Sequence, residues 1–362
     1  MLTSHAGPLS YIVPLLIAVA LVMATTLLAR RLSTKPLTWN WTRLPSLPAP
    51  RYDHALVTAR DGAIIALGGH PRPGETPCWD MWRLDARSTR WREHAAGNNE
   101  RITPRGSYAW EVLGDTAFVV GGFGETGNMA DVTAVHLVTG AIDALHDVSG
   151  TAPSRRSGAT LTALGGDRAV LFGGFGLLPK GTDGSLNDVH VLTLGSGANR
   201  WEPVAIEGPG PEARCAHTAV RLGDEVCIFG GYGRVKPLND SWALSLEPRA
   251  GSGWIGRWRR FEPVGELPVG RSGHSAVALD DHRLLVYGGM DATAARDDLH
   301  IFCARSQEWT ALGAVTGDEP GPRYNHRATI TQLRGKRVMA VAGGFNEERD
   351  AVGESFALEL PM

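Results

Sequence analysis

The sequence predicts an all-β protein, a six-bladed β-propeller over residues 36–362, with one transmembrane α-helix ahead of it. Six Gly-Gly doublets, each after a short apolar run, recur at intervals of 52 to 58 residues, a period typical of propeller blades. The 45 glycines, 22 prolines and 11 tryptophans suit many short strands joined by tight turns. An uncharged apolar segment near the N-terminus lies outside the repeats and predicts the helix.

Residues 1–35 are predicted to hold the membrane anchor. The stretch 9–29 carries no charge, and a helix of that length spans roughly 30 Å, the thickness of a bilayer core. A cleavable signal peptide is the alternative, but the first eight residues lack Lys and Arg and the apolar run is too long. Positive charges follow at Arg30, Arg31 and Lys35. We therefore expect a single-pass membrane protein with its propeller on the cytoplasmic side.

Composition excludes two other classes of protein. A net charge of −2 over 362 residues gives no basic face of the kind that nucleic-acid binding needs. The four cysteines, Cys78, Cys215, Cys227 and Cys303, do not have the spacing of a disulfide framework. We expect them to be buried free thiols.

Four landmarks recur in a fixed order along the chain. A proline–arginine segment is followed by an apolar run, a glycine doublet, an aspartate that opens another strand and a tryptophan that opens the last strand. The doublets end at Gly69, Gly122, Gly174, Gly231, Gly289 and Gly344. The aspartates are Asp80, Asp131, Asp188, Asp240 and Asp298. The tryptophans are Trp91, Trp201, Trp258 and Trp309, with Ile142 in that place in the second repeat.

The end of the chain predicts how the ring closes. The sixth repeat stops near Leu360 with no tryptophan strand after it, and the sequence WNWTRL, residues 39–44, supplies one at the other end. We therefore expect this N-terminal strand to complete the last blade. Such closure removes the open sheet edges that invite aggregation.

The pattern resembles the kelch family over about residues 38–360. The resemblance implies four-stranded antiparallel blades around a central channel. Longer connections occur in the third and fourth repeats, at residues 176–188 and 246–261. Long loops on a rigid scaffold are where binding specificity usually resides.

Metal and cofactor sites are not expected. Seven of the twelve histidines occupy equivalent repeat positions, so they are spread around the ring and cannot converge on one ion. The recurring aspartates more plausibly cap turns and tie strands than form a catalytic pair. We expect no cofactor and no catalytic residue.

One arginine in each repeat precedes the innermost strand, and equivalent blades would bring all of them to one mouth of the channel. These candidates for partner binding are Arg51, Arg105, Arg155 or Arg156, Arg214, Arg271 and Arg323. Guanidinium groups there would offer paired donors to carboxylate or phosphate. Equally, each arginine could bond only to carbonyls or an aspartate of the adjacent blade. The residues that follow the doublets are expected on the same face: His70, Phe123, Phe175, Tyr232, Met290 and Phe345.

The expected function is a membrane-anchored interaction scaffold, or an accessory subunit of a membrane complex. Its partner would be a protein, possessing an acidic segment for the arginines, because some kelch propellers grip acidic motifs in this way. The alternative is a metal-independent carbohydrate-active enzyme resembling sialic-acid epimerases, with Glu111 or Glu354 as acid–base groups. A sugar-binding propeller that uses the same channel mouth is a related alternative.

Overall fold

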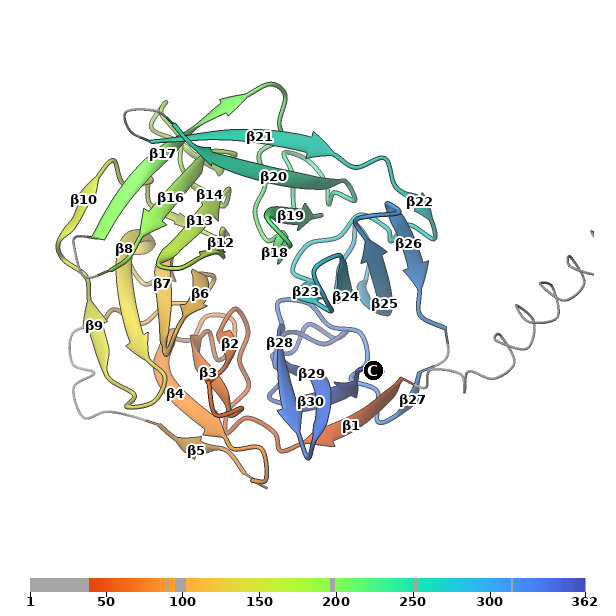
Figure 1. Ribbon diagram of the computed structural model, residues 1–362. Coiled ribbons are helices and arrows are strands. Elements are labelled where there is room, and N and C mark those ends of the chain that lie inside the picture. The colour runs from red at the N-terminus through yellow and green to blue at the C-terminus, as the bar shows by residue number, and fades with distance from the viewer. Residues whose placement is uncertain are drawn as a thin grey trace, which may run out of the picture. The chain divides into compact units, whose positions relative to one another are not determined.

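Short strands set around a central axis form the compact unit Asn40–Leu360 of the computed structural model (Figure 1). The structure describes residues 39–88, 90–94, 102–195, 199–249, 253–313 and 315–361. Within these ranges no helix is long and apolar enough to cross a membrane. The predicted anchor, residues 9–29, lies outside the described residues.

The first two repeats each form a four-stranded antiparallel sheet in simple up-and-down order. The first contains β2 (Ala55–Thr58), β3 (Ile64–Gly69), β4 (Cys78–Leu84) and β5 (Arg92–Glu93). The second contains β6 (Ala109–Leu113), β7 (Thr116–Gly124), β8 (Gly127–His136) and β9 (Ile142–Ala144). In both, the strand that contains the glycine doublet is the second of the sheet and is fully or largely buried.

The third and fourth repeats are joined into one nine-stranded sheet. The third repeat gives β12 (Thr160–Gly165), β13 (Arg168–Phe172), β16 (Val189–Thr193) and β17 (Asn199–Glu207), with β10 (Val148–Gly150) beside β17. The fourth gives β18 (Thr218–Leu222), β19 (Glu225–Phe229), β20 (Ser241–Pro248) and β21 (Trp254–Arg260). A parallel pairing of β17 with β21 connects the two. The long connection predicted at residues 246–261 is thus mostly an extended β20–β21 hairpin.

The long connection of the third repeat folds into part of a small three-stranded sheet. This sheet consists of β11 (Arg156–Ser157), β14 (Phe175–Leu177) and β15 (Asp183–Ser185). The fifth repeat forms the sheet β22 (Val264–Gly265), β26 (Glu308–Ala311), β25 (Ala295–Cys303), β24 (Arg283–Met290) and β23 (Ser275–Ala278). The sixth forms β27 (Thr316–Gly317), β1 (Asn40–Leu44), β30 (Ser355–Glu359), β29 (Lys336–Ala342) and β28 (Arg327–Leu333).

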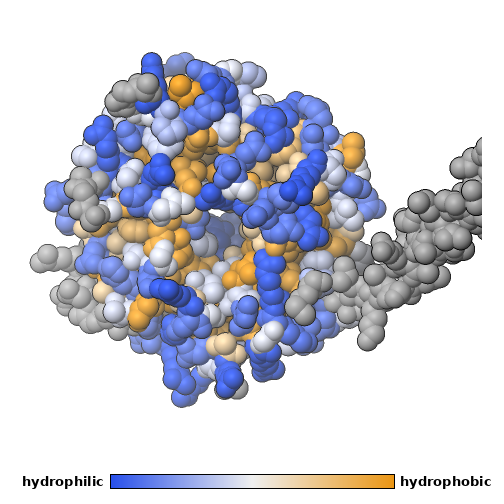
Figure 2. All heavy atoms as spheres, in the orientation of Figure 1, coloured by the Kyte–Doolittle hydropathy of each residue, from blue (hydrophilic) through white to orange (hydrophobic). Residues whose placement is uncertain are grey.

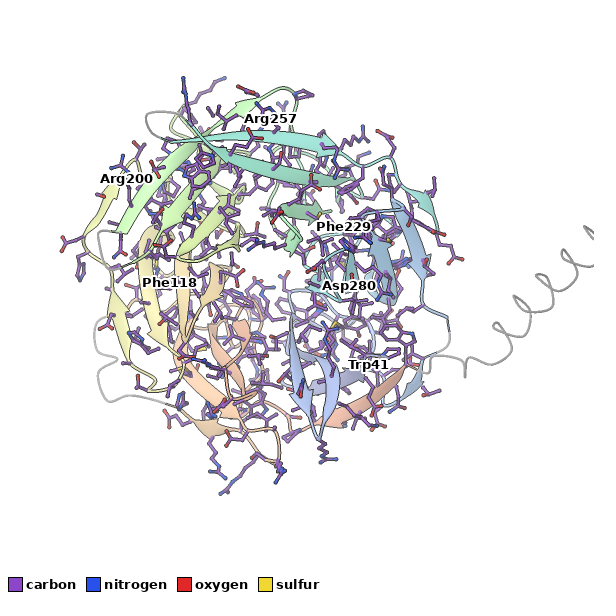
Figure 3. All side chains as sticks on the ribbon, in the orientation of Figure 1. Trp41, Phe118, Arg200, Phe229, Arg257 and Asp280 are labelled. Carbon is purple, nitrogen blue, oxygen red and sulfur yellow. The ribbon has the colours of Figure 1, made fainter. Side chains whose placement is uncertain are left out.

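The N-terminal strand pairs with the last strand of the chain, as the sequence predicts. β1 runs antiparallel to β30, with Asn40 opposite Glu359 and Leu44 opposite Ser355. Trp41, labelled in Figure 3, is 3% exposed. Its ring lies 5.3 Å from that of Tyr287. It takes the place in the sixth repeat that Trp309, also buried, holds in the fifth. Burying an indole removes roughly 150–250 Å² of surface from water. The burial of Trp41 therefore stabilises the pairing of β1 with β30.

The glycine doublets are required by close packing as well as by backbone conformation. Gly69 has a φ of 97°, and a Cβ there would lie 2.7 Å from the Cβ of His54. Gly344, the same position in the sixth repeat, has a φ of 93° and would bring a Cβ 2.7 Å from that of His326. Only glycine adopts this conformation without a steric cost and also leaves room for the inner strand.

Candidate functional site

Five repeat arginines form a paired contact with an aspartate of their own repeat. Arg214 donates from Nη1 and Nη2 to Asp240 at 2.7 and 2.9 Å, and Nη1 also donates to the carbonyl of Gly230 at 2.9 Å. The other pairs are Arg51–Asp80, Arg105–Asp131, Arg156–Asp188 and Arg271–Asp298. Each arginine therefore links the start of an inner strand to its glycine doublet and to the next strand outward. The partner aspartate comes from the same repeat, not from the adjacent blade.

These arginines are buried. The repeat arginines, Arg323 included, are no more than 2% exposed, whereas the five partner aspartates are 19–45% exposed. Burial by itself would raise the pKa of Asp240, but the hydrogen bonds and charge of Arg214 outweigh it and lower that pKa. The expectation of an open ring of guanidinium groups at the channel mouth is therefore wrong, because their donors are already used. Arg156 is the repeat arginine of the third repeat, while Arg155 is half-exposed and lies 3.3 Å from Asp183.

The sixth repeat departs from this pattern. Arg323 has no aspartate partner among the described residues; it donates to the carbonyls of Gly343 and Pro320 and lies 3.8 Å from Glu354. Glu354 also accepts from Arg43 of β1 at 2.7 Å. Its carboxylate thus replaces the repeat aspartate and is bound on both sides by cations. This geometry is that of a structural carboxylate, which disfavours Glu354 as an acid–base group.

A closed ring of backbone hydrogen bonds surrounds one end of the channel. In it, the amide of each residue donates to the carbonyl of the equivalent residue in the preceding repeat, at distances of 2.6 to 3.0 Å. Its members are Asp53, Ser107, Gly158, Ala216, Gly273 and Asn325. All six have φ between 51° and 63°, which turns each amide toward the neighbouring repeat. No sequence pattern predicts this ring, because only one of its positions holds an asparagine and two hold glycine.

The channel behind the ring has a volume of about 580 Å³ and is lined by all six inner strands. Figure 2 shows apolar residues gathered around the central opening, with hydrophilic residues at the outer rim. The histidines of the inner strands bond to hydroxyls of the preceding repeat: His217 to Thr160, His274 to Thr218 and His326 to Ser275, at 2.8 to 2.9 Å. No three His, Cys, Asp or Glu side chains in the described part of the chain are placed to hold a metal ion.

Glu111 is the one of the two suggested acid–base groups that does line the channel. Burial raises the pKa of its carboxyl, and the backbone amides of Val112 and Ala163 oppose that effect. These amides donate to the two carboxylate oxygens at 2.8 and 2.9 Å. Glu111 therefore accepts hydrogen bonds from backbone amides of two neighbouring inner strands, β6 and β12.

The residues after the doublets surround the ringed end of the channel, which we call the mouth. Each forms an antiparallel pair with the residue that follows the repeat arginine. The pairs are Tyr52–His70, Gly106–Phe123, Ser157–Phe175, Cys215–Tyr232, Ser272–Met290 and Tyr324–Phe345. The prediction that the post-doublet residues share one face is consistent with these equivalent pairings.

Two neighbouring pairs of the mouth, in the first and sixth repeats, are covered by their own aromatic rings. Tyr324 stacks on Phe345 with centroids 5.1 Å apart, Phe345 lies 4.2 Å from Tyr52, and Tyr52 stacks on His70 at 5.1 Å. As a result Phe345 and His70 are each only 8% exposed. Neither is available as an open contact surface, contrary to expectation.

Three of the six pairs, in the second, third and fourth repeats, are open, because small residues stand opposite their aromatic rings. Phe123, Phe175 and Tyr232 are 48%, 42% and 43% exposed. Their partners Gly106, Ser157 and Cys215 carry no ring that could cover them. We call these three pairs the open half. Exposed aromatic rings beside small residues are typical of protein-contact surfaces.

Exposed cations stand on the loops of the open half. Lys180 follows Phe175 in the third repeat, and Arg234 and Lys236 follow Tyr232 in the fourth; all three side chains are exposed. Glu212 accepts from the backbone amide of Arg234 and so braces this loop. The repeat arginines are neutralised inside the fold. A partner would therefore meet these loop cations here, together with the half-exposed Arg155 beside Asp183.

A family model for the KLHDC2/KLHL20/DRC7 Kelch-repeats domain matches residues 29–196 and 144–344. Among curated proteins, serine/threonine-protein phosphatase BSL2 of Arabidopsis thaliana is 32% identical over 197 residues, 54% of this chain and 18% of that protein. Adagio-like protein 1 of Oryza sativa subsp. japonica is 35% identical over 180 residues, 49% of this chain and 26% of that protein.

A third relative, the leucine-zipper-like transcriptional regulator 1 homolog of Drosophila melanogaster, is 26% identical over 313 residues, 81% of this chain and 30% of that protein. The chain therefore spans less than a third of the length of each of these relatives. The solved structure of YjhT superposes with a TM-score of 0.65 at 16% identity and covers 88% of this chain and 97% of its own. At that identity the likeness concerns the fold alone.

Proposed function

The chain belongs to the kelch-repeat family, and we propose that its propeller is a protein-interaction module that binds a partner at the open half of the mouth. The observation that carries this proposal is the exposure of Phe123, Phe175 and Tyr232, each opposite a small residue. Large aromatic side chains left uncovered in this way supply most of the binding energy in protein interfaces. In this proposal the propeller has no catalytic role.

The proposed partner presents an acidic segment. Lys180, Arg234 and Lys236 stand beside the exposed rings, and charged side chains at a rim steer and orient a complementary partner. This assigns recognition to the surface loops of the third and fourth repeats. The buried repeat arginines support it only by fixing the loops in place.

We also propose that the module has six blades. The nine-stranded sheet then divides at the parallel β17–β21 contact into two blades of four strands each, with β10 beside β17 as the ninth strand. Support comes from the backbone ring, which contains one residue from each of six repeats and returns to its start. A five-bladed arrangement would leave one repeat outside this ring.

We propose further that residues 9–29 anchor the module as a single-pass protein with the propeller on the cytoplasmic side, as an accessory subunit of a membrane complex. The uncharged stretch and the positive charges after it support this. Resistance to extraction by alkaline carbonate would test the anchor. Protease added on the side of the membrane opposite the cytoplasm would test the orientation. The propeller should then be digested only after the membrane is permeabilised.

Co-purification with matched variants tests the interaction. The full chain, a Phe175→Ser, Tyr232→Ser variant and a Val264→Ser, Leu267→Ser control are purified from solubilised native membranes, and bound proteins are identified by mass spectrometry. The control residues are at least as exposed, at 60% and 43%, but lie in and just after the edge strand β22. A stoichiometric partner retained by the control and lost by the mouth variant is the expected result.

A thiol footprint locates the contact directly. Cys215 lies opposite Tyr232 in the open half, so a bound partner should slow its alkylation, while Cys303 in β25 should react at an unchanged rate. Unchanged alkylation of Cys215 in the complex would place the partner elsewhere and contradict the proposal. A partner that binds the Arg234→Glu, Lys236→Glu variant but not the aromatic variant would contradict the acidic segment. It would still support the open half as the binding site.

A further inference from the structure

A second cleft lies at the far end of the propeller from the mouth, between the first and sixth repeats. Its volume is about 610 Å³, and the turns that follow β2, β4 and β28 line it. The inner strands β2 and β28 and the third strand β4 all run away from the mouth, so the turns that follow them stand at the opposite end. Four arginines line this cleft: Arg60, Arg87, Arg334 and Arg337.

The positive charge of the cleft is largely uncompensated. Among the residues that line it, Asp61 is the single carboxylate, and Asp61 is already bound by Arg83. Arg87 and Arg334 have no ion-pair partner within the described ranges, and Arg60 lies 3.9 Å from Asp115. Arg337 donates to the carbonyls of Ala278 and Leu279, which holds it at the cleft without neutralising it.

The backbone at Arg334 is held in a conformation that arginine rarely adopts. Arg334 has a φ of 51° and Gly335 a φ of 78°, in the two-residue turn between β28 and β29. Asparagine or glycine is the preferred residue at the first of these positions. A non-glycine residue held in such a conformation strains the backbone, and strained positions of this kind cluster at binding sites.

We infer that this cleft binds a phosphate-bearing ligand that carries several negative charges. Guanidinium groups present paired donors that match phosphate oxygens. Within the described residues those of Arg87 and Arg334 are in no ion pair, while Arg60 and Arg337 add positive charge beside them. The ligand could be a free polyphosphate or the headgroup of a phosphorylated lipid, since both offer the same chemistry. The inference does not depend on the mouth, because the two sites lie at opposite ends of the propeller.

Titration calorimetry of the full chain in detergent tests this at two salt concentrations. The ligands are inorganic tripolyphosphate and dioctanoyl phosphatidylinositol bisphosphate, with dioctanoyl phosphatidylcholine as the uncharged reference. The main variant is Arg334→Asn, which removes the charge but places a residue favoured in this turn, so the fold is kept. The matched control is Arg349→Asn. Arg349 is also an exposed arginine with positive φ, 66°, but it lies in the loop after the sixth doublet, at the mouth end.

The expected result is binding by the wild type that weakens with added salt, and a loss of about tenfold in affinity for Arg334→Asn with no change for Arg349→Asn. Binding of tripolyphosphate would identify a free polyphosphate as sufficient. Binding of the lipid alone, with the same dependence on Arg334, would identify a lipid headgroup. The inference is overturned if neither charged ligand binds, or if the two variants bind as the wild type does.

Discussion

Arg43 and Glu354 lie 311 positions apart in the chain, and Arg43 donates to Glu354 at 2.7 Å. The same carboxylate lies 3.8 Å from the buried Arg323, and the ring of Phe356 lies 5.4 Å from Arg43 and 5.1 Å from Arg323. The first strand of the propeller is thereby tied to the polar centre of its last repeat. This contact lies beside the β1–β30 pairing that closes the ring.

Closure should depend on the buried indole far more than on this ion pair. Replacing Trp41 with alanine should lower the free energy of unfolding by about 3–5 kcal/mol, because it leaves a cavity against Tyr287. Arg43→Ala should cost less than about 1 kcal/mol, since the Arg43 side chain is 56% exposed. Urea unfolding followed by tryptophan fluorescence and circular dichroism measures both. A Trp41→Ala loss as small as that of Arg43→Ala would show that β1 is not the closing strand.

The repeat arginines should behave as structural groups. Arg214→Met removes one partner of a buried pair and should destabilise the protein by about 3–5 kcal/mol, because Asp240 keeps an uncompensated charge. The control is Arg155→Met, which removes the half-exposed arginine beside a repeat arginine and should cost less than about 1 kcal/mol. Chemical denaturation compares them. If Arg214→Met were as stable as the wild type, the ion pair would not be structural. Arg214 would then again be a candidate for binding a ligand.

Acid should destabilise the fold through its buried histidines. Burial lowers the pKa of His217 to about 3 and also lowers the pKa values of His54, His274 and His326. In the unfolded chain these groups take up protons near pH 6.5, so stability is full above that pH and falls as the pH drops toward the folded-state values. Each such histidine contributes a slope of up to roughly 1.4 kcal/mol per pH unit.

His54 offers a direct check on this pH dependence. Both of its ring nitrogens are buried without a hydrogen-bond partner among the described residues, so leucine can replace it at little polar cost. His54→Leu should therefore reduce the slope of stability against pH between 6 and 4 by about one proton. Thermal unfolding at a series of pH values measures the slope. An unchanged slope would mean that His54 does not stay neutral in the folded state.

The doublet glycines should differ sharply from glycines of loops. Gly69→Ala combines a positive φ with a Cβ placed 2.7 Å from His54 and should cost more than about 2 kcal/mol. Gly74→Ala has a similar φ of 83° but open space around it, and should cost about 1 kcal/mol. The difference between the two variants isolates the packing contribution. If both variants lose the same stability, glycine is required at the doublet only for its backbone conformation and not for close packing.

Sequence periodicity was sufficient to predict the repeats and the pairing of β1 with β30, because both follow from local apolar patterning and one missing strand. It could not decide what the repeat arginines do. The same residue at the same spacing can face a ligand or an aspartate 26 to 32 positions later, and only the folded distance separates these cases. The small residues Gly106, Ser157 and Cys215, which follow the repeat arginines, are present in the sequence. They indicate an exposed aromatic ring only once the fold shows which ring lies opposite each of them.

By itself, then, the sequence determined a kelch propeller, its repeat boundaries and its closing strand, since strands and turns are encoded by short-range pattern. The tertiary structure decided which polar groups are satisfied internally and which remain free. Burial turned the arginine ring into structural ion pairs and Glu354 into a tie between the ends of the chain. It left the free aromatic rings and cations on loops, where long-range packing alone fixes which side chains are covered.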